Sequence, residues 1–248
     1  MIIKSKVKYI NSLGDKKLRD ADRVFVAEGP KIINELLGEP AMVPMEIFAL
    51  KEWIRPHLNP SIPITEVDEI MLERLSFLST PNQVVGLFKM PANSPLDMKN
   101  KVSVIVDGIQ DPGNLGTIVR CADWFGVEQV ICSKDSADVF NPKTVQSTMG
   151  SIARIKVYYE DLATLLKKNQ AHDTNSNFKI YAAALNGSDV KKIMPITEGA
   201  IIIGNESKGI SENILALANE KITIPRRGKA ESLNAAIATG IILSHVLR

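Results

Sequence analysis

From residue 102 to the C-terminus, short apolar runs alternate with stretches that have helical periodicity. Apolar strands that are separated by helices form parallel sheets with helices on both faces. The pattern therefore predicts a parallel-sheet α/β domain. Its expected strands cover residues 102–106, 129–132, 155–158, 179–184, 200–204 and 221–224. Its expected helices cover residues 118–125, 142–149, 162–168, 211–218 and 232–247.

Before residue 92 the alternation is less regular and predicts a smaller α/β domain. Its expected strands are 24–27, 47–50, 62–67 and 84–89, and its expected helices are 31–37 and 68–75. Residues 91–100 contain two prolines and several polar turn formers, which is typical of a linker. We therefore expect domains at residues 1–92 and 101–248, joined by a linker at 93–100.

Composition and charge narrow the class of protein. The chain has 248 residues, of which 45% are hydrophobic and 23% are charged, as in ordinary globular domains. No apolar run approaches the roughly 18 residues that span a bilayer. The N-terminus lacks the apolar core of a signal peptide, so we expect a cytoplasmic protein with no membrane partner.

The cysteines and histidines offer no metal or redox chemistry. Cys121 and Cys132 are eleven positions apart, a spacing that matches no disulfide framework and no zinc motif. Both lie in apolar surroundings, where a thiol is usually a small core residue. The three histidines are far apart in the sequence. We therefore expect no bound metal.

Ligands of parallel α/β sheets bind in the loops at the carboxyl ends of the strands. The first such loop runs from Asp107 to Thr117 and enters the helix that contains Arg120. Asn114 stands where a side chain can cap that helix. The planar guanidinium of Arg120 could hold a phosphate or a carboxylate. The alternative is an Asn cap followed by a solvated Arg.

The second loop, residues 204–211, nearly matches the phosphate-binding pattern G-x-x-x-x-G-K-[ST]. Ile210 occupies the position of the essential lysine, so nucleotide triphosphate hydrolysis is only a weak alternative. The apolar strand that ends at Asp107 resembles one with a metal-binding acid, but it precedes the loop. The plain interpretation is a glycine-rich turn with Ser211 capping a helix.

The third loop, residues 225–234, combines cations with polar groups. Ser232 is a plausible helix cap, and the small residues at 235–238 permit close helix packing. Glu231, Ser232 and Asn234 offer an acceptor, a hydroxyl and an amide on one short segment. The cations of this stretch are Lys221, Arg226, Arg227 and Lys229.

Together and in this order, the three loops are specific enough to indicate one protein family. NLGTIVRCADWFG, IIIGNESKGIS and IPRRGKAESLNAAIATGI resemble the signature motifs of the SpoU/TrmH family. That family belongs to the SPOUT superfamily and transfers a methyl group from S-adenosylmethionine to a ribose 2′-hydroxyl of RNA. The resemblance covers residue 102 to the C-terminus. The segment AEGPKIINELL resembles the start of the small RNA-binding domain, related to a ribosomal protein, that many members carry.

The resemblance also implies a fold, an assembly and a set of site residues. The fold is a parallel α/β sheet with a C-terminal trefoil knot, and the assembly is a homodimer. The implied catalytic residues are Asn114, Arg120, Glu206, Ser232 and Asn234. The implied residues around S-adenosylmethionine are Gly204, Asn205, Glu206, Gly209, Ile224, Leu233 and Asn234.

In this reaction the 2′-oxygen must align with the methyl carbon and lose its proton. A guanidinium rarely gives up its proton in a protein. We therefore expect Arg120 to clamp the adjacent phosphate and to stabilise the developing alkoxide. Glu206 could take the proton or only hold its loop in shape.

RNA contacts are expected where cations gather. The formal net charge is only +2, yet the first twenty residues carry +4, because six cations stand against two carboxylates. That segment is either a solvated basic arm or a contact to the RNA backbone, where phosphate neutralisation dominates binding. The expected RNA-binding residues are Lys4, Lys6, Lys8, Lys16, Lys17, Arg19, Arg226 and Arg227.

The two-domain layout favours ribosomal RNA as the substrate. Transfer RNA is the alternative, and a catalytically silent RNA-binding or ribosome-assembly factor on the same fold is another. Aromatic residues make up only 5% of the chain, which disfavours extensive base-stacking surfaces.

Overall fold

The computed structural model describes residues 4–57, 62–92, 94–171 and 178–247. The chain divides into two compact units. The first unit comprises Met1–Ala92 together with Asp138–Ala153, and the second comprises Asn93–Ala137 with Arg154–Arg248. All ten strands expected from the sequence are present, although several of their ends differ.

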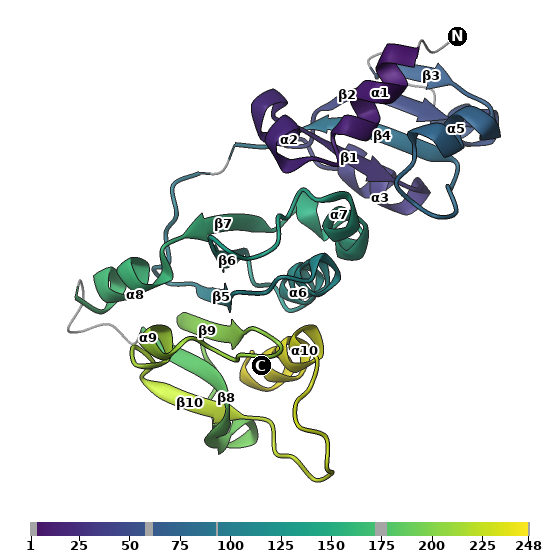
Figure 1. Cartoon of the computed structure of the whole chain (residues 1–248). Helices are drawn as coiled ribbons and strands as arrows, with labels where there is room; N and C mark the ends of the chain where they lie inside the picture. The colour runs from purple at the N-terminus through teal and green to yellow at the C-terminus, as the bar shows by residue number, and fades with distance from the viewer. Residues whose placement is uncertain (1–3, 58–61, 93, 172–177, 248) are drawn as a thin grey trace. The chain divides into compact units, whose positions relative to one another are not determined.

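The first unit is built on a mixed sheet of four strands (Figure 1). The strand order is β1-β4-β2-β3, and β4 runs antiparallel to both of its neighbours. The strands are β1 (Val24–Glu28), β2 (Pro44–Ala49), β3 (Ile64–Glu66) and β4 (Val84–Lys89). The helices are α1 (Lys4–Ser12), α2 (Lys16–Asp22), α3 (Pro30–Leu37), α4 (Lys51–Ile54) and α5 (Glu69–Leu75), with a 3₁₀ turn at Arg55–His57.

The basic N-terminal segment forms two helices that the sequence pattern did not predict. Ile10 and Leu13 are fully buried in a cluster with residues of β1, β4 and α5, and Val7 packs against it. These apolar positions are three residues apart, which places them on one helical face. The segment is therefore no free arm, because one side of it belongs to the core of the first unit.

Arg19 of α2 is buried, with 1% of its surface exposed. Its Nη1 donates to the carbonyl oxygens of Leu13 (2.7 Å) and Gly14 (2.8 Å), and its Nη2 donates to Oδ2 of Asp138 (2.6 Å). Asp138 begins the segment that comes from the second half of the sequence. A guanidinium that is buried, with Nη1 and Nη2 both bonded to protein acceptors, is not available to an RNA phosphate, which corrects the expected role of Arg19.

The rest of the segment 138–153 also packs within the first unit. The ring of Phe140 lies 5.0 Å from that of Phe25 in β1, measured between centroids. Helix α7 (Pro142–Thr148) packs on β1, and the 3₁₀ turn Ser151–Ala153 packs on α3. The boundaries 1–92 and 101–248 stay a prediction, but these contacts join residues 138–153 to the first unit.

The second unit is a fully parallel sheet of six strands in the order β10-β8-β9-β5-β6-β7. This confirms the predicted α/β class. The strands are β5 (Val102–Asp107), β6 (Gln129–Ser133), β7 (Lys156–Glu160), β8 (Lys179–Asp189), β9 (Gly199–Gly204) and β10 (Glu220–Thr223). Trefoil-knot topology stays a prediction.

Helices cover both faces of this sheet (Figure 1). On one side α6 (Pro112–Trp124) packs against α10 (Ala235–Val246). On the other side lie α8 (Leu162–Ala171) and α9 (Glu212–Leu215), over a core that includes Ile105, Ile131 and Ile202. The central strands carry β-branched residues on both faces, which explains their continuous apolar runs.

The segment expected as a linker is fastened to the second unit. Met98 is 3% exposed and belongs to the core beneath α8, with Leu96 packed beside it. The side chain of Gln129 donates to the carbonyl oxygen of Asp97 (3.0 Å). Prolines and polar turn formers predicted the irregular backbone, but two apolar residues anchor it.

Among the described residues, no helix is both long enough and apolar enough to cross a bilayer.

We predict that Arg19→Met lowers the free energy of unfolding by about 3–5 kcal/mol, because it leaves Asp138 and two carbonyl groups without their buried donor. Urea denaturation followed by circular dichroism measures the change. The matched control is Lys31→Met, which replaces an exposed cation on α3 and should stay within about 0.5 kcal/mol of wild type. Equal stability of the two variants would contradict the role given to Arg19.

Candidate active site

The three loops singled out in the sequence leave the carboxyl ends of β5, β9 and β10. β5 and β9 are direct neighbours, and β6 lies on the other side of β5. In a parallel sheet these ends share one edge, so the loops gather there.

A chain of two side-chain hydrogen bonds joins all three loops. Nδ2 of Asn234 donates to Oδ1 of Asn114 (2.8 Å), and Nδ2 of Asn114 donates to Oε1 of Glu206 (2.6 Å). The second bond ends on a carboxylate and is therefore charge-assisted. The structure thus brings together three of the expected catalytic residues, which lie 92 and 120 positions apart in sequence.

The helix caps differ from those expected. Asp111, not Asn114, caps α6, and its Oδ1 accepts the backbone N–H of Asn114 (2.9 Å). Asn234, not Ser232, caps α10, and its Oδ1 accepts from Ala236 (2.9 Å) and Ile237 (3.2 Å). Because the caps stand elsewhere, both ends of the Asn114 amide are free to bridge the loops.

The second loop is closed by its own hydrogen bonds. The backbones of Asn205 and Gly209 exchange two bonds of 3.0 and 2.9 Å. Oδ1 of Asn205 accepts the N–H groups of Ser207 and Lys208. A Cβ on Gly204 would lie 2.3 Å from the carbonyl carbon of Gly209, and Gly209 itself has φ +71°. Both glycines are therefore required by backbone geometry.

Two residues of the first loop hold this second loop from outside. Nδ2 of Asn205 donates to the carbonyl oxygen of Gly108 (2.7 Å). Ser211 stands at the N-cap position of α9, but its side chain makes no cap bond and donates to Asp107 instead. The expected capping role of Ser211 is therefore wrong.

Arg120 lies on the exposed face of α6. It is six residues beyond Asn114, a separation of roughly 9 Å along the helix axis. Within the described part of the chain it makes no hydrogen bond and no ion pair. Its guanidinium is thus accessible to a ligand, but it does not belong to the Asn114 network.

The remaining residues of the third loop stay outside the network as well. Ser232 is exposed and has no hydrogen-bond partner among the described residues, and Leu233 is 47% exposed. Ile224 is half-buried at the end of β10. Arg226 and Arg227 are exposed, and Nη1 of Arg226 donates to the carbonyl oxygen of Ala230 (3.3 Å).

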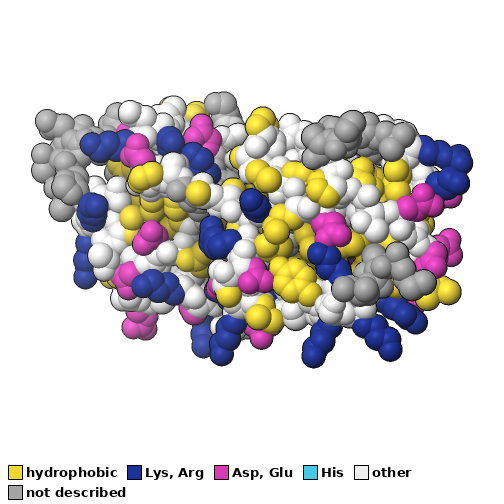
Figure 2. Space-filling model, turned by 90° about the horizontal axis from the view of Figure 1, so that it is seen from above, with side chains coloured by type: hydrophobic (Ala, Val, Ile, Leu, Met, Phe, Trp, Pro, Cys, Tyr) yellow, Lys and Arg dark blue, Asp and Glu magenta, His cyan; other side chains and the backbone are white. Residues whose placement is uncertain are grey.

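The cations of the first unit that were expected to bind RNA differ in how exposed they are. Lys6 forms an ion pair of 2.5 Å with Glu46, whereas Arg19 is buried. Exposed cations are found at Lys4, Lys8, Lys16 and Lys17. On the face drawn in Figure 2, Lys and Arg side chains are mixed with acidic side chains, and several Lys and Arg side chains lie along the lower edge.

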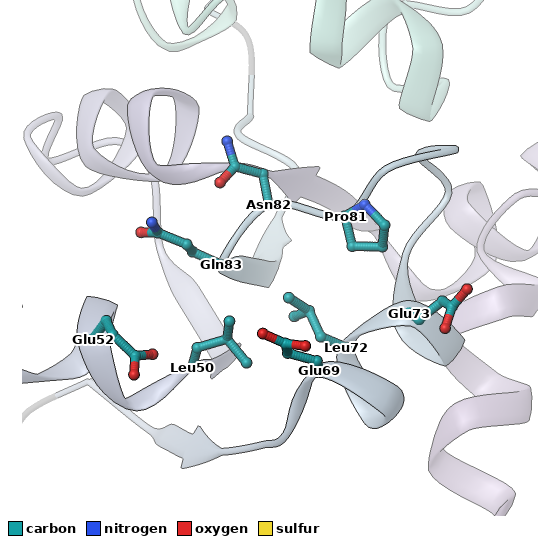
Figure 3. Close-up of a pocket in the computed structure, with 8 residues that line it drawn as sticks. All are labelled: Leu50, Glu52, Glu69, Leu72, Glu73, Pro81, Asn82 and Gln83. Carbon is teal, nitrogen blue, oxygen red and sulfur yellow. The ribbon is translucent and has the colours of Figure 1, made fainter.

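A hollow in the first unit lies among acidic side chains. It is lined by Leu50, Glu52, Glu69, Leu72, Glu73, Pro81, Asn82 and Gln83 (Figure 3). Carboxylates repel RNA phosphates, and no residue of the three motifs lines this hollow. The candidate site is therefore the loop network of the second unit.

The cysteines have packing roles. Cys132 is buried in β6, and Cys121 is half-buried with Sγ 3.8 Å from the carbonyl oxygen of Ala236. Burial raises the pKa of both thiols, which keeps them protonated and unreactive. Within the described ranges, no cluster of His, Cys, Asp and Glu could hold a metal ion.

Sequence reasoning missed Asp107, Gly108 and Asp111 as parts of the site. One signal was present for Asp111, because an Asp followed by Pro is a frequent helix start. The strand pattern marked Asp107 only by its resemblance to a metal-binding acid, and its partner Ser211 lies 104 residues away.

A parallel sheet preceded by a mixed α/β unit is a fold that this chain shares with TrmH-like RNA methyltransferases. A TrmH-family chain from Porphyromonas gingivalis superimposes with a TM-score of 0.87 at 32% identity, over 99% of this chain and 98% of that one. An S-adenosylmethionine-bound rRNA methyltransferase from Sinorhizobium meliloti superimposes with a TM-score of 0.85 at 30% identity, over 99% and 95%.

The chain belongs to the SpoU rRNA methylase family, whose model matches residues 101–244. An MRM3-like substrate binding domain matches residues 4–86. The chain is 32% identical to 23S rRNA (guanosine(2553)-2′-O)-methyltransferase RlmP of Bacillus subtilis, over 97% of this chain and 95% of the relative. The family and the cofactor implied by the sequence motifs are thereby confirmed.

We predict that Gly204→Ala weakens S-adenosylmethionine binding at least about tenfold, because the new Cβ would strike backbone atoms of Gly209 and Ile210 that cannot move aside cheaply. Isothermal titration calorimetry measures the affinity. Gly38→Ala is the matched control, since a Cβ there makes only ordinary contacts of 3.4 Å or more. Wild-type affinity in Gly204→Ala would show that the loop tolerates expansion.

Proposed function

We propose that this protein transfers the methyl group of S-adenosylmethionine to a ribose 2′-hydroxyl of ribosomal RNA. The observation that carries the proposal is the bridge from Asn234 through Asn114 to Glu206, which unites the three family motifs. The Bacillus subtilis relative, which this chain matches over nearly its whole length, supports ribosomal RNA as the substrate.

The residues at the loop cluster fit the cofactor. The close approach of Gly204 to Gly209 makes a compact backbone loop that no larger residue could form. Such loops bind a ligand through backbone N–H and C=O groups. When bound, S-adenosylmethionine supplies an electrophilic methyl group on a sulfonium. The residues that would hold it are Gly204, Asn205, Glu206, Gly209, Ile224, Leu233 and Asn234.

Asn114 acts as a positioning residue in this proposal, since both ends of its amide are occupied by Glu206 and Asn234. The bond from Asn114 also supports a loop-holding role for Glu206. Arg120 binds the phosphate next to the target ribose and stabilises the alkoxide that develops on the 2′-oxygen. Ser232, exposed and free of protein partners in the described region, contacts the RNA backbone.

The RNA contacts of the first unit come from Lys4, Lys8, Lys16 and Lys17, which are exposed on α1 and α2. In the second unit Arg226 and Arg227 contact the same substrate. Lys6 contributes less, because Glu46 already neutralises it. Arg19 is left out, because it is buried.

We further propose a cytoplasmic homodimer with a knotted C-terminal segment. Trp124 at the end of α6 is 82% exposed and Ile237 on α10 is 56% exposed, and large apolar side chains at such positions favour a protein interface. The knot is proposed from the resemblance of the three loops to the SpoU/TrmH motifs.

We predict that Arg120→Ala lowers methyl incorporation by about 10²-fold or more, the scale on which the loss of an electrostatic stabiliser acts. S-adenosylmethionine affinity should stay within about threefold of wild type, since the Arg120 side chain makes no hydrogen bond or ion pair to the cofactor loops among the described residues. The assay uses labelled S-adenosylmethionine with ribosomal RNA from cells that lack the protein, together with calorimetry. Lys168→Ala, an exposed cation on α8, is the control with unchanged turnover.

Three outcomes would overturn these assignments. A collapse of cofactor affinity in Arg120→Ala would remove Arg120 from the RNA side of the site. No incorporation by wild type, despite tight RNA binding, would favour the silent assembly factor. Incorporation into transfer RNA instead of ribosomal RNA would change the substrate class, and mapping of 2′-O-methyl positions identifies the nucleotide.

The proposed dimer is tested by introducing negative charge at the two exposed apolar residues. Trp124→Glu combined with Ile237→Glu should shift the molar mass in multi-angle light scattering from dimer to monomer, because the carboxylates would be buried without partners. Met194→Glu is the matched control, as Met194 is 79% exposed and lies on neither helix. A variant that remains dimeric would place the interface elsewhere.

A further inference from the structure

Asp107 is the last residue of β5, where it pairs with Gly204 at the end of β9. Its Oδ2 accepts two hydrogen bonds from one residue, from the backbone N–H of Ser211 (2.8 Å) and from the Ser211 hydroxyl (2.7 Å). Asp107 therefore lies beside the start of the 204–211 loop and holds its far end.

The next residue holds the near end of the same loop. The carbonyl oxygen of Gly108 accepts from Nδ2 of Asn205 (2.7 Å), and its N–H donates to Oγ of Ser133 at the end of β6 (2.8 Å). Gly108 has φ +70°, a conformation that glycine adopts without strain. Two consecutive residues thus fasten both ends of the 204–211 loop to the sheet edge.

This arrangement fixes where Glu206 stands. Between its fastened ends the loop is closed by the backbone pair of Asn205 and Gly209. Glu206 lies within that closed turn, and its Oε1 accepts a hydrogen bond from the side-chain amide Nδ2 of Asn114. A loop released at Ser211 would keep its internal turn but lose its placement over the ends of β5 and β9.

The chemistry of the contact calls for a carboxylate. One oxygen that accepts two donors is best served by an anion, because charge-assisted hydrogen bonds are shorter and stronger than neutral ones. The same contacts argue against the metal-binding acid that the apolar strand before Asp107 suggested. Its Oδ2 is occupied by protein donors, and no metal-ligand cluster includes it within the described ranges.

We propose that Asp107 is a positioning residue for the cofactor: through Ser211 it holds the 204–211 loop in the conformation that binds S-adenosylmethionine, without touching the cofactor itself. The proposal rests on the proposed function, in which that loop receives the cofactor. It assigns Asp107 and Ser211 a joint task that neither residue performs alone.

The test is a double-mutant cycle on the full-length protein, with S-adenosylmethionine affinity measured by calorimetry. Asp107→Ala should weaken binding at least about tenfold, as expected for loss of hydrogen bonds to a charged acceptor. Ser211→Ala should weaken it about threefold, because the backbone donor remains. The double variant should match Asp107→Ala alone, since the hydroxyl has no partner once the carboxylate is gone.

The conservative variant and a matched control separate positioning from general stability. Asp107→Asn keeps an acceptor oxygen without the charge and should fall between wild type and Asp107→Ala. In Asp107→Ala the KM for S-adenosylmethionine should rise while kcat at saturating cofactor changes less than threefold. Asp161→Ala removes a similar carboxylate, which accepts the N–H of Thr164 (2.8 Å) beside α8, and should leave the affinity unchanged.

Three results would overturn the proposal. Wild-type affinity in Asp107→Ala would show that the loop holds itself. Independent effects of Asp107→Ala and Ser211→Ala that multiply in the double variant would show that Asp107 acts through another partner. An equal loss in Asp161→Ala would reduce the effect to general stability. Failure of the wild type to bind S-adenosylmethionine would refute the proposed function instead, so the two failures are distinguishable.

Discussion

A primary amide can donate at one end while it accepts at the other, and the loop cluster depends on this property of Asn114. Its nitrogen binds Glu206 and its oxygen binds Asn234, so one side chain sets the spacing of three loops that are remote in sequence. An acid of the same shape would repel Glu206 unless it were protonated, and a hydrophobic residue would leave two polar partners unpaired. Other contacts of the site hold in place the 204–211 loop that this amide reaches.

The helix caps are made by atoms that do not compete with the amide of Asn114. Asp111 accepts one free N–H at the start of α6, that of Asn114, and Asn234 caps α10 with its oxygen while its nitrogen donates to Asn114. The two polar atoms of the Asn234 side chain therefore have different partners. Arg120 lies on the exposed face of α6, so the groups that join the loops are separate from the cation proposed to bind the RNA phosphate.

Patterns along the chain predicted the strands well, because β-branched apolar runs of buried parallel strands are local signals. The first helix was missed, since Val7, Ile10 and Leu13 are a sparse apolar stripe among lysines. Asn114 and Ser232 were expected as caps, although Asp111 and Asn234 take that role, because several capping residues stand within three positions of each other. Motif resemblance found the three loops, but their hydrogen bonds depend on tertiary contacts that no local pattern encodes.

The return of residues 138–153 to the first unit has a consequence for how the chain can be divided. The backbone passes from one unit to the other after residues 92, 137 and 153, so no single cut separates them. A fragment that began at residue 101 would carry Phe140 and Asp138 away from Phe25 and Arg19, exposing an aromatic ring and a carboxylate that the intact chain keeps packed. Neither half of the sequence could therefore be exchanged for another domain without rebuilding residues 138–153.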